Sequence, residues 1–306
     1  MDTKLIEYIL TIAETKSIAK SAEELFLTQS ALNQQLLKLE KELGAPLFVR
    51  TRNHWELTDV GTLYVESSKK MLEIKKDTYS RIEDMAKRWK GTVTVGLTPE
   101  RGIQMFTSIY PEIHAQYPET IFQPYEADVE TQIKLLDSGQ LDFGFHTIFE
   151  HKYKHIIYRH ILYEPFYLCV PRSHPLAYKD KRTPENYPEI SLTEFKNDLF
   201  TLVRKTSTLR AVIDRLFAKA GFKPKLLFES ISMRTMQRLA ANGQCCSIIP
   251  RYYAVEDDDV AYFTLGPESY WELSTAYAKN HYINAAMETF IRMASDYWLA
   301  HSYIEY

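Results

Sequence analysis

The 306-residue chain lacks several features that would assign it to particular classes of protein. No apolar run approaches the roughly 18 residues that a membrane-spanning helix needs. The first residues, MDTKLIEYIL, have neither the basic segment nor the long apolar core of a secretion signal. Three cysteines do not make a disulfide framework. We therefore expect a cytoplasmic protein.

An excess of positive charge is also missing. The net charge is −3, from 37 basic and 40 acidic side chains. Residues 1–90 carry 15 Lys and Arg against 14 Asp and Glu, and the remainder carries 22 against 26. A strongly basic domain would indicate nucleic-acid binding, and this chain has only local basic pairs. If it binds DNA, its non-specific affinity should be modest, because phosphate contacts supply that affinity.

The most informative segment that is present spans residues 17–43, SIAKSAEELFLTQSALNQQLLKLEKEL. It predicts two helices with one sharp break, since Ser17 and Thr28 are both good N-caps. Apolar residues recur at helical spacing on each side of the break, and Gly44 ends the second helix. Two short helices joined by a tight turn form a helix-turn-helix, whose second helix lies in the DNA major groove.

Polar side chains gather on the outward face at the start of the second helix. Asn and Gln amides there could form paired hydrogen bonds with adenine. The following segment, 47–57, predicts two short strands around a basic tip, which is a wing that would meet phosphates or a minor groove. The alternatives are a solvated helix face and a solvated hairpin tip. The predicted DNA-binding residues are Thr28, Gln29, Ser30, Asn33, Gln34, Lys38, Arg50 and Arg52.

The first sixty residues match a family pattern without gaps. The matching positions are Leu5, Ile9, Ala13, Ser17, Ala22, Leu25, Thr28, Gln29, Ser30, Ala31, Leu32, Gln35, Leu39, Glu40, Leu43, Gly44, Leu47, Phe48, Arg50, Leu57, Thr58 and Gly61. In these residues the chain resembles LysR-type transcriptional regulators. It departs from them at Asn33-Gln34, where the family usually has Ser-Arg. The operator sequence therefore cannot be borrowed from other members.

Residues 59–90 predict one long helix that starts at the cap Thr58. Its apolar residues step by threes and fours, which approximates a heptad seam. The resemblance implies that this helix dimerises, giving a homodimer or homotetramer. The alternative is packing on the chain's own second domain. The predicted dimerisation residues are Tyr64, Met71, Ile74, Ile82 and Met85.

Beyond Gly91, short apolar strands alternate with helices, which indicates an α/β sheet. We expect a helix over 103–117 that Pro111 breaks or kinks, and a strand over 141–145. The resemblance implies an α+β multidomain protein: a winged helix-turn-helix (1–58), a linker helix (59–90) and an effector domain (91–306). The effector domain would have two α/β subdomains of the periplasmic-binding-protein type, about 91–164 plus 268–306 and about 165–267.

A ligand should sit beyond the carboxyl ends of the strands in such a sheet. Thr98, Pro99 and Arg101 follow the first strand, and the Arg101 guanidinium could clamp a carboxylate. The resemblance adds Thr147 and a hydroxyl-rich loop containing Thr206 and Ser207. For the hydroxyl groups the alternative role is a helix cap, and for Arg101 it is a surface salt bridge.

These observations predict a DNA-binding transcription regulator that responds to a small-molecule effector of unknown identity. Its partners would be double-stranded DNA, the effector and further copies of itself, with RNA polymerase as a further candidate. We expect no other cofactor, no metal site and no enzyme, since the chain has no nucleophile elbow, HExxH, Walker loop or GxGxxG. Two alternatives stay open: an enzyme with an appended DNA-binding head, and a redox-responsive regulator that uses Cys245 and Cys246.

Overall fold

The computed structural model describes residues 3–50, 55–86, 89–255 and 257–302. The chain divides into two compact units, 1–85 and 86–306, and each unit has its own hydrophobic core. None of the helices in the described ranges combines the length and the apolar character needed to cross a membrane.

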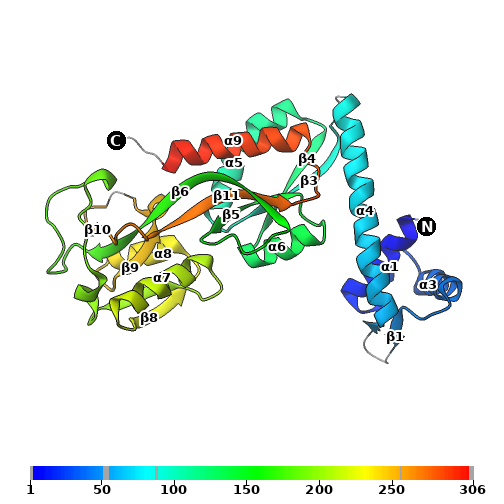
Figure 1. The fold of residues 1–306 in the computed structure, drawn as a ribbon, viewed down its shortest axis with the longest axis horizontal. Helices are drawn as coiled ribbons and strands as arrows, with labels where there is room; N and C mark the ends of the chain where they lie inside the picture. The colour runs from blue at the N-terminus through cyan, green and yellow to red at the C-terminus, as the bar shows by residue number, and fades with distance from the viewer. Residues whose placement is uncertain (1–2, 51–54, 87–88, 256, 303–306) are drawn as a thin grey trace. The chain divides into compact units, whose positions relative to one another are not determined.

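The first unit is a winged helix-turn-helix followed by a long helix, as predicted (Figure 1). Its core joins side chains from every helix of the unit, among them Ile9, Ala22, Leu36 and Tyr64. The two short strands pair antiparallel, with Phe48 opposite Leu57. The elements are α1 (Thr3–Thr15), α2 (Ile18–Glu24), α3 (Gln29–Leu43), β1 (Phe48–Arg50), β2 (Trp55–Leu57) and α4 (Asp59–Ala86).

The helix boundaries of this unit follow from capping chemistry. The Thr28 hydroxyl accepts a hydrogen bond from the Ala31 amide at 3.1 Å, and Ser17 does the same for Lys20. Gly44 ends α3 in the left-handed region, at φ 73°, which only glycine adopts freely. The Thr58 hydroxyl accepts from the Gly61 amide at 2.9 Å and so starts α4. The predicted caps are therefore confirmed.

The second unit contains one large sheet and a separate pair of strands (Figure 1). The strand order of the seven-stranded sheet is β10-β6-β11-β5-β3-β4, with β9 also paired to β6. The strands are β3 (Gly91–Leu97), β4 (Thr120–Glu126), β5 (Phe143–Ile148), β6 (Ile156–Pro171), β7 (Leu199–Val203), β8 (Lys225–Ser230), β9 (Ser247–Pro250), β10 (Val260–Thr264) and β11 (Tyr270–Ala278). The helices are α5 (Arg101–Gln116), α6 (Val129–Asp137), α7 (Thr208–Ala220), α8 (Met233–Ala241) and α9 (Ala285–Ser302).

Two large cores make this unit bilobed, and a third, smaller one includes the buried apolar residues of α6. The first lobe surrounds the core of β3, β5, α5 and α9, with Phe290 packed on Phe122 and Phe143. The second lobe surrounds the core of β7, α7, α8, β9 and β10. The 16-residue strand β6 belongs to both, since Ile156–Pro165 pair with β11 and Phe166–Pro171 pair with β9 and β10. The two lobes are therefore connected through the backbone of β6 and through its hydrogen bonds to β11 in one lobe and to β9 and β10 in the other.

Two expectations for the second unit need correction in part. Helix α5 continues through Pro111 without a break, with Ile109 and Ile113 buried on the first core, and a kink at Pro111 stays a prediction. The predicted strand over 141–145 is instead β5 over 143–148. Asp142 leaves the strand because its carboxylate accepts hydrogen bonds from the Thr94 amide and hydroxyl, at 2.7 and 2.8 Å. β5 then continues to Ile148, which pairs with Glu272 of β11.

Substituting Gly61 should destabilise the first unit. A Cβ atom built at Gly61 would lie 2.0 Å from the Leu47 carbonyl oxygen, so α4 or the wing would have to shift. We expect Gly61→Ala to cost about 2 kcal/mol or more, in the range of overpacked interiors. Hydrogen exchange measured by mass spectrometry on peptides from residues 3–85 would report the loss. Ser67→Ala, farther along α4, is the control and should change exchange little.

Candidate functional site

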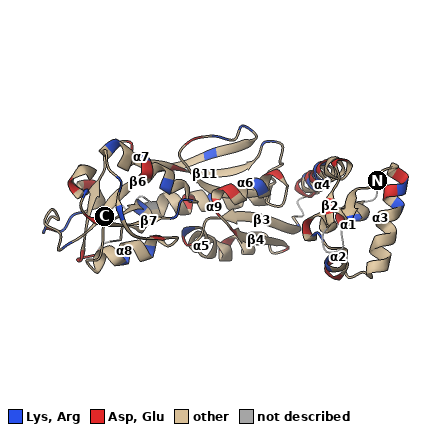
Figure 2. Cartoon of the chain, turned by 90° about the horizontal axis from the view of Figure 1, so that it is seen from below, with Lys and Arg blue, Asp and Glu red and all other residues tan. Residues whose placement is uncertain are grey.

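The outward face of α3 is polar and uncharged over its first half. Gln29, Ser30 and Gln34 are exposed, and Asn33 is half-buried. Figure 2 shows this half of α3 without charged residues, whereas Lys and Glu gather toward its C-terminal end. Lys38 is exposed at the beginning of that charged half. The start of α3 therefore offers amides and hydroxyls, which read base edges, rather than cations, which hold phosphates.

The wing residue Arg50 contacts α3, the second helix of the helix-turn-helix. The Arg50 guanidinium forms an ion pair with the Glu40 carboxylate of α3 and lies 5.1 Å from the centre of the Trp55 ring. The second carboxylate oxygen of Glu40 accepts a hydrogen bond from the Leu47 amide at 2.8 Å. Arg50 thus fixes the wing to α3, and only part of its charge is left for a phosphate. Arg52 lies outside the described residues.

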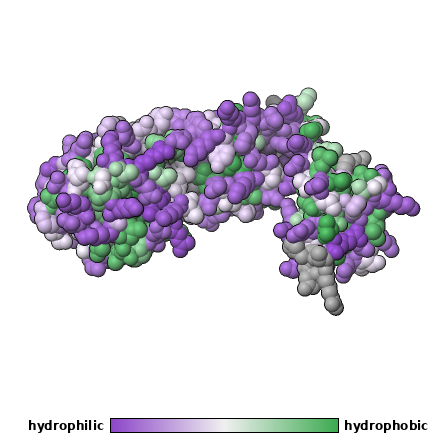
Figure 3. All heavy atoms as spheres, turned by 60° about the horizontal axis from the view of Figure 1, so that its bottom comes forward, coloured by the Kyte–Doolittle hydropathy of each residue, from purple (hydrophilic) through white to green (hydrophobic). Residues whose placement is uncertain are grey.

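Apolar side chains continue along α4 beyond the core of the first unit. Met71, Ile74, Ile82 and Met85 are exposed, with fractions from 43% to 87%. Figure 3 shows hydrophobic atoms at the surface of this unit. Tyr64 does not belong to this set, contrary to the prediction. Its side chain is buried in the core of its own unit, because at that level α4 packs on the helix-turn-helix.

The six residues predicted to bind an effector all line one cavity of about 150 Å³ between the two lobes. Thr98 and Pro99 lie between β3 and α5, and Thr147 is buried near the end of β5. Thr206 and Ser207 come from the other lobe, immediately before α7. Residues more than a hundred positions apart in the sequence therefore meet across one space, which we call the interlobe cleft.

Four helices of eight or more residues begin at the interlobe cleft. The N-caps of α5, α6 and α7 and the first residue of α8 all line it. The first amides of a helix point toward its N-terminus, and the helix dipole makes that end positive. The Ser207 hydroxyl accepts a hydrogen bond from the Leu209 amide at 3.3 Å, so it caps α7 and still faces the cavity. The cleft thus offers helix N-termini to a polar ligand, and two of their N-caps, Glu100 and Asp128, are carboxylates that line the same space.

Arg101 lines the cavity and is paired inside the protein. Its side chain is only 3% exposed, and its guanidinium donates to the Glu164 carboxylate at 2.6 Å. It also lies between two aromatic rings, 4.8 Å from the centre of Tyr252 and 4.7 Å from that of Trp298. Its Nε and Nη2 atoms are buried without a hydrogen-bond partner among the described residues, and Arg101 lines the cavity, so the clamp stays a prediction. The alternative role for Arg101 was a surface salt bridge. Arg101 does form a salt bridge, but the pair is buried.

Glu164 is the centre of this arrangement. Besides Arg101, its carboxylate accepts hydrogen bonds from the Trp271 indole at 2.6 Å and from the Tyr252 amide at 2.8 Å. The donors come from α5, β11 and the segment after β9, which belong to both lobes. We call Arg101, Glu164, Tyr252, Trp271 and Trp298 the hinge cluster.

Several residues of the cleft were missed by sequence reasoning. Asp128 follows β4 as Thr98 follows β3, so its position at a strand end was a usable signal. Tyr253, Met233 and Trp271 also line the cavity, but they lie far along the chain and carry no local motif. His146, which precedes Thr147, is fully buried in β5. Burial lowers the pKa of its imidazole to about 3, so this ring stays neutral.

The three thiols do not have the properties of redox sensors. Cys169, Cys245 and Cys246 are all buried and free. Burial is the largest influence on each and raises the pKa of each thiol above its ordinary value. A reactive cysteine needs a lowered pKa and access to solvent. The geometry therefore opposes the alternative in which Cys245 and Cys246 sense oxidants.

Removing the charge of Glu164 should destabilise the second unit strongly. Glu164→Gln keeps the shape but leaves the Arg101 guanidinium buried without a counter-charge, which costs about 3–5 kcal/mol in comparable sites. Urea unfolding followed by tryptophan fluorescence would measure the loss. Glu268→Gln breaks the exposed pair with Lys219 and serves as control, at about 1 kcal/mol or less. Equal losses in the two variants would contradict the role given to Glu164.

Comparison with known proteins agrees with both units. Residues 3–62 match the family described as "Bacterial regulatory helix-turn-helix protein, lysR family", and residues 86–298 match "LysR substrate binding domain". The transcriptional regulator YybE of Bacillus subtilis is 26% identical over 95% of this chain and 97% of its own length. OxyR of Escherichia coli K12, a dual regulator of transcription, is 24% identical over 82% of this chain and 79% of its own.

Solved structures show the same fold over nearly the whole chain. A full-length OxyR variant from Pseudomonas aeruginosa superposes with a TM-score of 0.68 at 21% identity, covering 97% of each chain. CbnR bound to its target DNA superposes with a TM-score of 0.51 at 21% identity, covering 96% of this chain and 100% of the CbnR chain. With a helix-turn-helix at one end and a bilobed effector-binding domain at the other, the chain belongs to the LysR family of transcriptional regulators.

Proposed function

We propose that this regulator reads its operator mainly through the neutral face at the start of α3. The observation that carries the proposal is the set of exposed or half-exposed amides and hydroxyls there, on a helix held in place by the wing. Asn33, Gln29 and Gln34 would contact base edges, and adenine matches their paired donor and acceptor. Lys38 and Arg50 would contact the backbone, which orients the protein without reading sequence.

The regulator would act as a homodimer or homotetramer held together through α4. Met71, Ile74, Ile82 and Met85 leave an exposed apolar stripe that a second copy could bury. Two-fold symmetry would also match paired DNA half-sites. The structure of CbnR in complex with its target DNA supports DNA as the partner of this chain.

The effector would bind in the interlobe cleft, against Thr98, Pro99, Thr147, Thr206 and Ser207. The converging helix N-termini favour a ligand with a polar group. Since both lobes contribute walls, a ligand would favour the closed arrangement in proportion to its greater affinity for it. Arg101 would contribute by holding the hinge cluster together beside the cleft.

The remaining expectations follow from this role. A protein that reads chromosomal DNA works in the bacterial cytoplasm, where RNA polymerase is a further partner to test. We propose no catalytic role, because the residues that line the interlobe cleft are assigned to capping, packing and ligand contact.

Asn33→Ala should selectively weaken binding to the cognate site. Losing a paired amide contact costs about 1–3 kcal/mol on the correct base and much less on random DNA. Fluorescence anisotropy with DNA from around the protein's own gene and with scrambled DNA, across a salt series, would measure both. Lys38→Ala is the contrasting variant, which should weaken both complexes alike and reduce the salt dependence. Equal loss on both DNAs for Asn33→Ala would remove Asn33 from base reading.

Met71→Glu combined with Ile74→Glu should weaken self-association. The two carboxylates would lie in the apolar stripe of α4, where burial against a second copy requires neutral side chains. Light scattering across a dilution series should show a lower mass for the variant. Thr62→Glu with Ser80→Glu places the same charge on the other side of α4 and should leave the mass unchanged. An unchanged mass for the Met71 and Ile74 variant would refute the seam.

A further inference from the structure

Phe26, in the turn between α2 and α3, is the most exposed large hydrophobic side chain among the described residues. It is 95% exposed, whereas its neighbours Leu25 and Leu27 pack against the core of the first unit. Its backbone is also unusual, because φ is 53°, in the left-handed region that bulky residues rarely adopt. Phe26 thus combines two unfavourable features, an aromatic ring almost wholly in water and a strained backbone.

The left-handed backbone follows from the way in which α2 ends. The Phe26 amide donates to the Glu23 carbonyl at 3.1 Å, and the Leu27 amide donates to the Ala22 carbonyl at 2.8 Å. This pair of hydrogen bonds is a Schellman motif, in which the residue after the C-cap is left-handed. Leu27 and Ala22 both belong to the core of the unit, so the motif also directs the chain into α3. Glycine would occupy the position of Phe26 with the least strain.

Two other helices of this chain end in the same motif, and both use glycine. After α6 and α8, Gly139 and Gly243 follow the C-cap as Phe26 does, at φ 70° and 74°. Their amides and the amides of the next residues form the same pair of hydrogen bonds. The end of α2 therefore does not by itself require a phenyl ring, and the ring should have another role.

The ring lies close to the residues assigned to base reading. Phe26 is three residues before Gln29, the first residue of α3, so at most roughly 11 Å separate their Cα atoms. The major groove is about 12 Å wide, so a side chain at this distance from the start of a recognition helix can reach the same groove. Phe26 is therefore an exposed apolar group beside the exposed polar groups of Gln29 and Ser30.

The chemistry of the ring limits what it can recognise on DNA. A phenyl ring has no hydrogen-bonding group for a phosphate or a polar base edge. In the major groove the apolar group of a base pair is the C5-methyl of thymine, and phenylalanine is one of the side chains that contact it. Covering this methyl group would remove both apolar surfaces from water. An adenine–thymine pair offers this methyl group next to the adenine edge that the amides of α3 match.

We propose that Phe26 contacts a thymine methyl group in the operator and so contributes to the choice of DNA sequence. This inference rests on the proposed function of α3 and adds an apolar contact to its polar ones. In the free protein the ring is exposed, and it would be buried only on a site that places a thymine beneath it. Its apolar surface would therefore stabilise the specific complex rather than the free protein.

Binding to DNA with and without thymine methyl groups tests this contact. Fluorescence anisotropy would compare the full chain on one fragment from around its own gene, made either with thymine or with uracil, which lacks only the methyl group. Phe26→Gly should weaken binding to the thymine fragment by about threefold to tenfold and change binding to the uracil fragment little. Phe26→Leu keeps an apolar side chain and should retain most of the preference for thymine.

Folding stability gives a second readout, which a purely structural role would move in the opposite direction. Because glycine relieves the left-handed strain, Phe26→Gly should slow hydrogen exchange in peptides from residues 3–43 by about twofold to fivefold. Lys16→Gly is the matched control, since Lys16 is exposed and also left-handed, at φ 52°. It should slow exchange too, and it should leave the ratio of affinities for the thymine and uracil fragments unchanged.

The outcomes separate this contact from the proposed function. An equal loss on both fragments for Phe26→Gly would overturn the methyl contact. No loss on either fragment would overturn any contact with DNA and would leave the ring to a protein partner or to solvent. Faster exchange in Phe26→Gly would show that the ring stabilises the turn, which would also overturn the proposal. In these cases the proposed function stands if the unmodified protein prefers its own fragment to scrambled DNA, and loss of that preference would refute both.

Discussion

The buried Arg101–Glu164 pair is the interaction on which the ligand-binding unit depends. A carboxylate and a guanidinium, each almost fully removed from water, are costly unless every charge and hydrogen bond is matched. Here the Glu164 carboxylate accepts hydrogen bonds from Arg101, the Trp271 indole and the Tyr252 amide. The Nε and Nη2 atoms of Arg101 have no hydrogen-bond partner among the described residues, and the guanidinium lies between the rings of Tyr252 and Trp298. Because the donors come from both lobes, the lobes cannot separate at this point without exposing an uncompensated charge.

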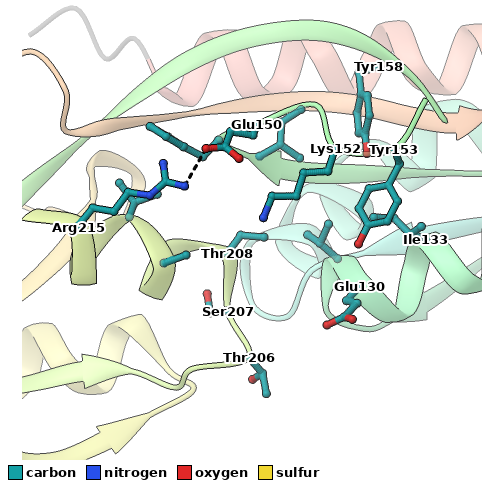
Figure 4. A pocket seen from close by; sticks show the side chains of 15 residues that line it. Glu130, Ile133, Glu150, Lys152, Tyr153, Tyr158, Thr206, Ser207, Thr208 and Arg215 are labelled. Carbon is teal, nitrogen blue, oxygen red and sulfur yellow. Dashed lines mark hydrogen bonds and ion pairs between the residues drawn. The ribbon is translucent and has the colours of Figure 1, made fainter. Parts of the chain in front are cut away.

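Because the hinge cluster holds the two lobes together, we expect them to move relative to each other mainly away from that cluster. Near the interlobe cleft, contacts between the lobes are weaker and more exposed, such as the hydrogen bond from Arg234 to Gln104 at 3.1 Å. At another contact between the lobes, the Arg215–Glu150 pair is about half exposed (Figure 4). Exposed pairs contribute little free energy, so they can break and re-form as ligands enter. A buried hinge cluster, combined with weaker and more exposed contacts between the lobes elsewhere, suits a domain whose lobes move when a ligand binds.

Local patterns predicted those features that depend on near neighbours in the chain. Thr28 and Gly44 mark the ends of α3 because capping involves only the adjacent turn. The alternation of strands and helices after Gly91 likewise predicted an α/β unit, and the strand ends predicted where a cleft would form. All six residues assigned to effector binding line one cavity, and the clamp expected of Arg101 stays a prediction.

The sequence by itself therefore determined the helix-turn-helix, the family and the approximate position of the cleft, since capping, periodicity and strand order are encoded within short windows. Only the tertiary structure decided which partner each side chain contacts. Tyr64 continues the apolar stripe of α4 in the sequence, yet it is buried in its own unit because α1 to α3 cover that level of the helix. Arg101 follows a strand as a ligand-binding residue would, yet its charge is paired with Glu164, 63 residues later. Such partners are far apart in the chain, and only folding brings them together.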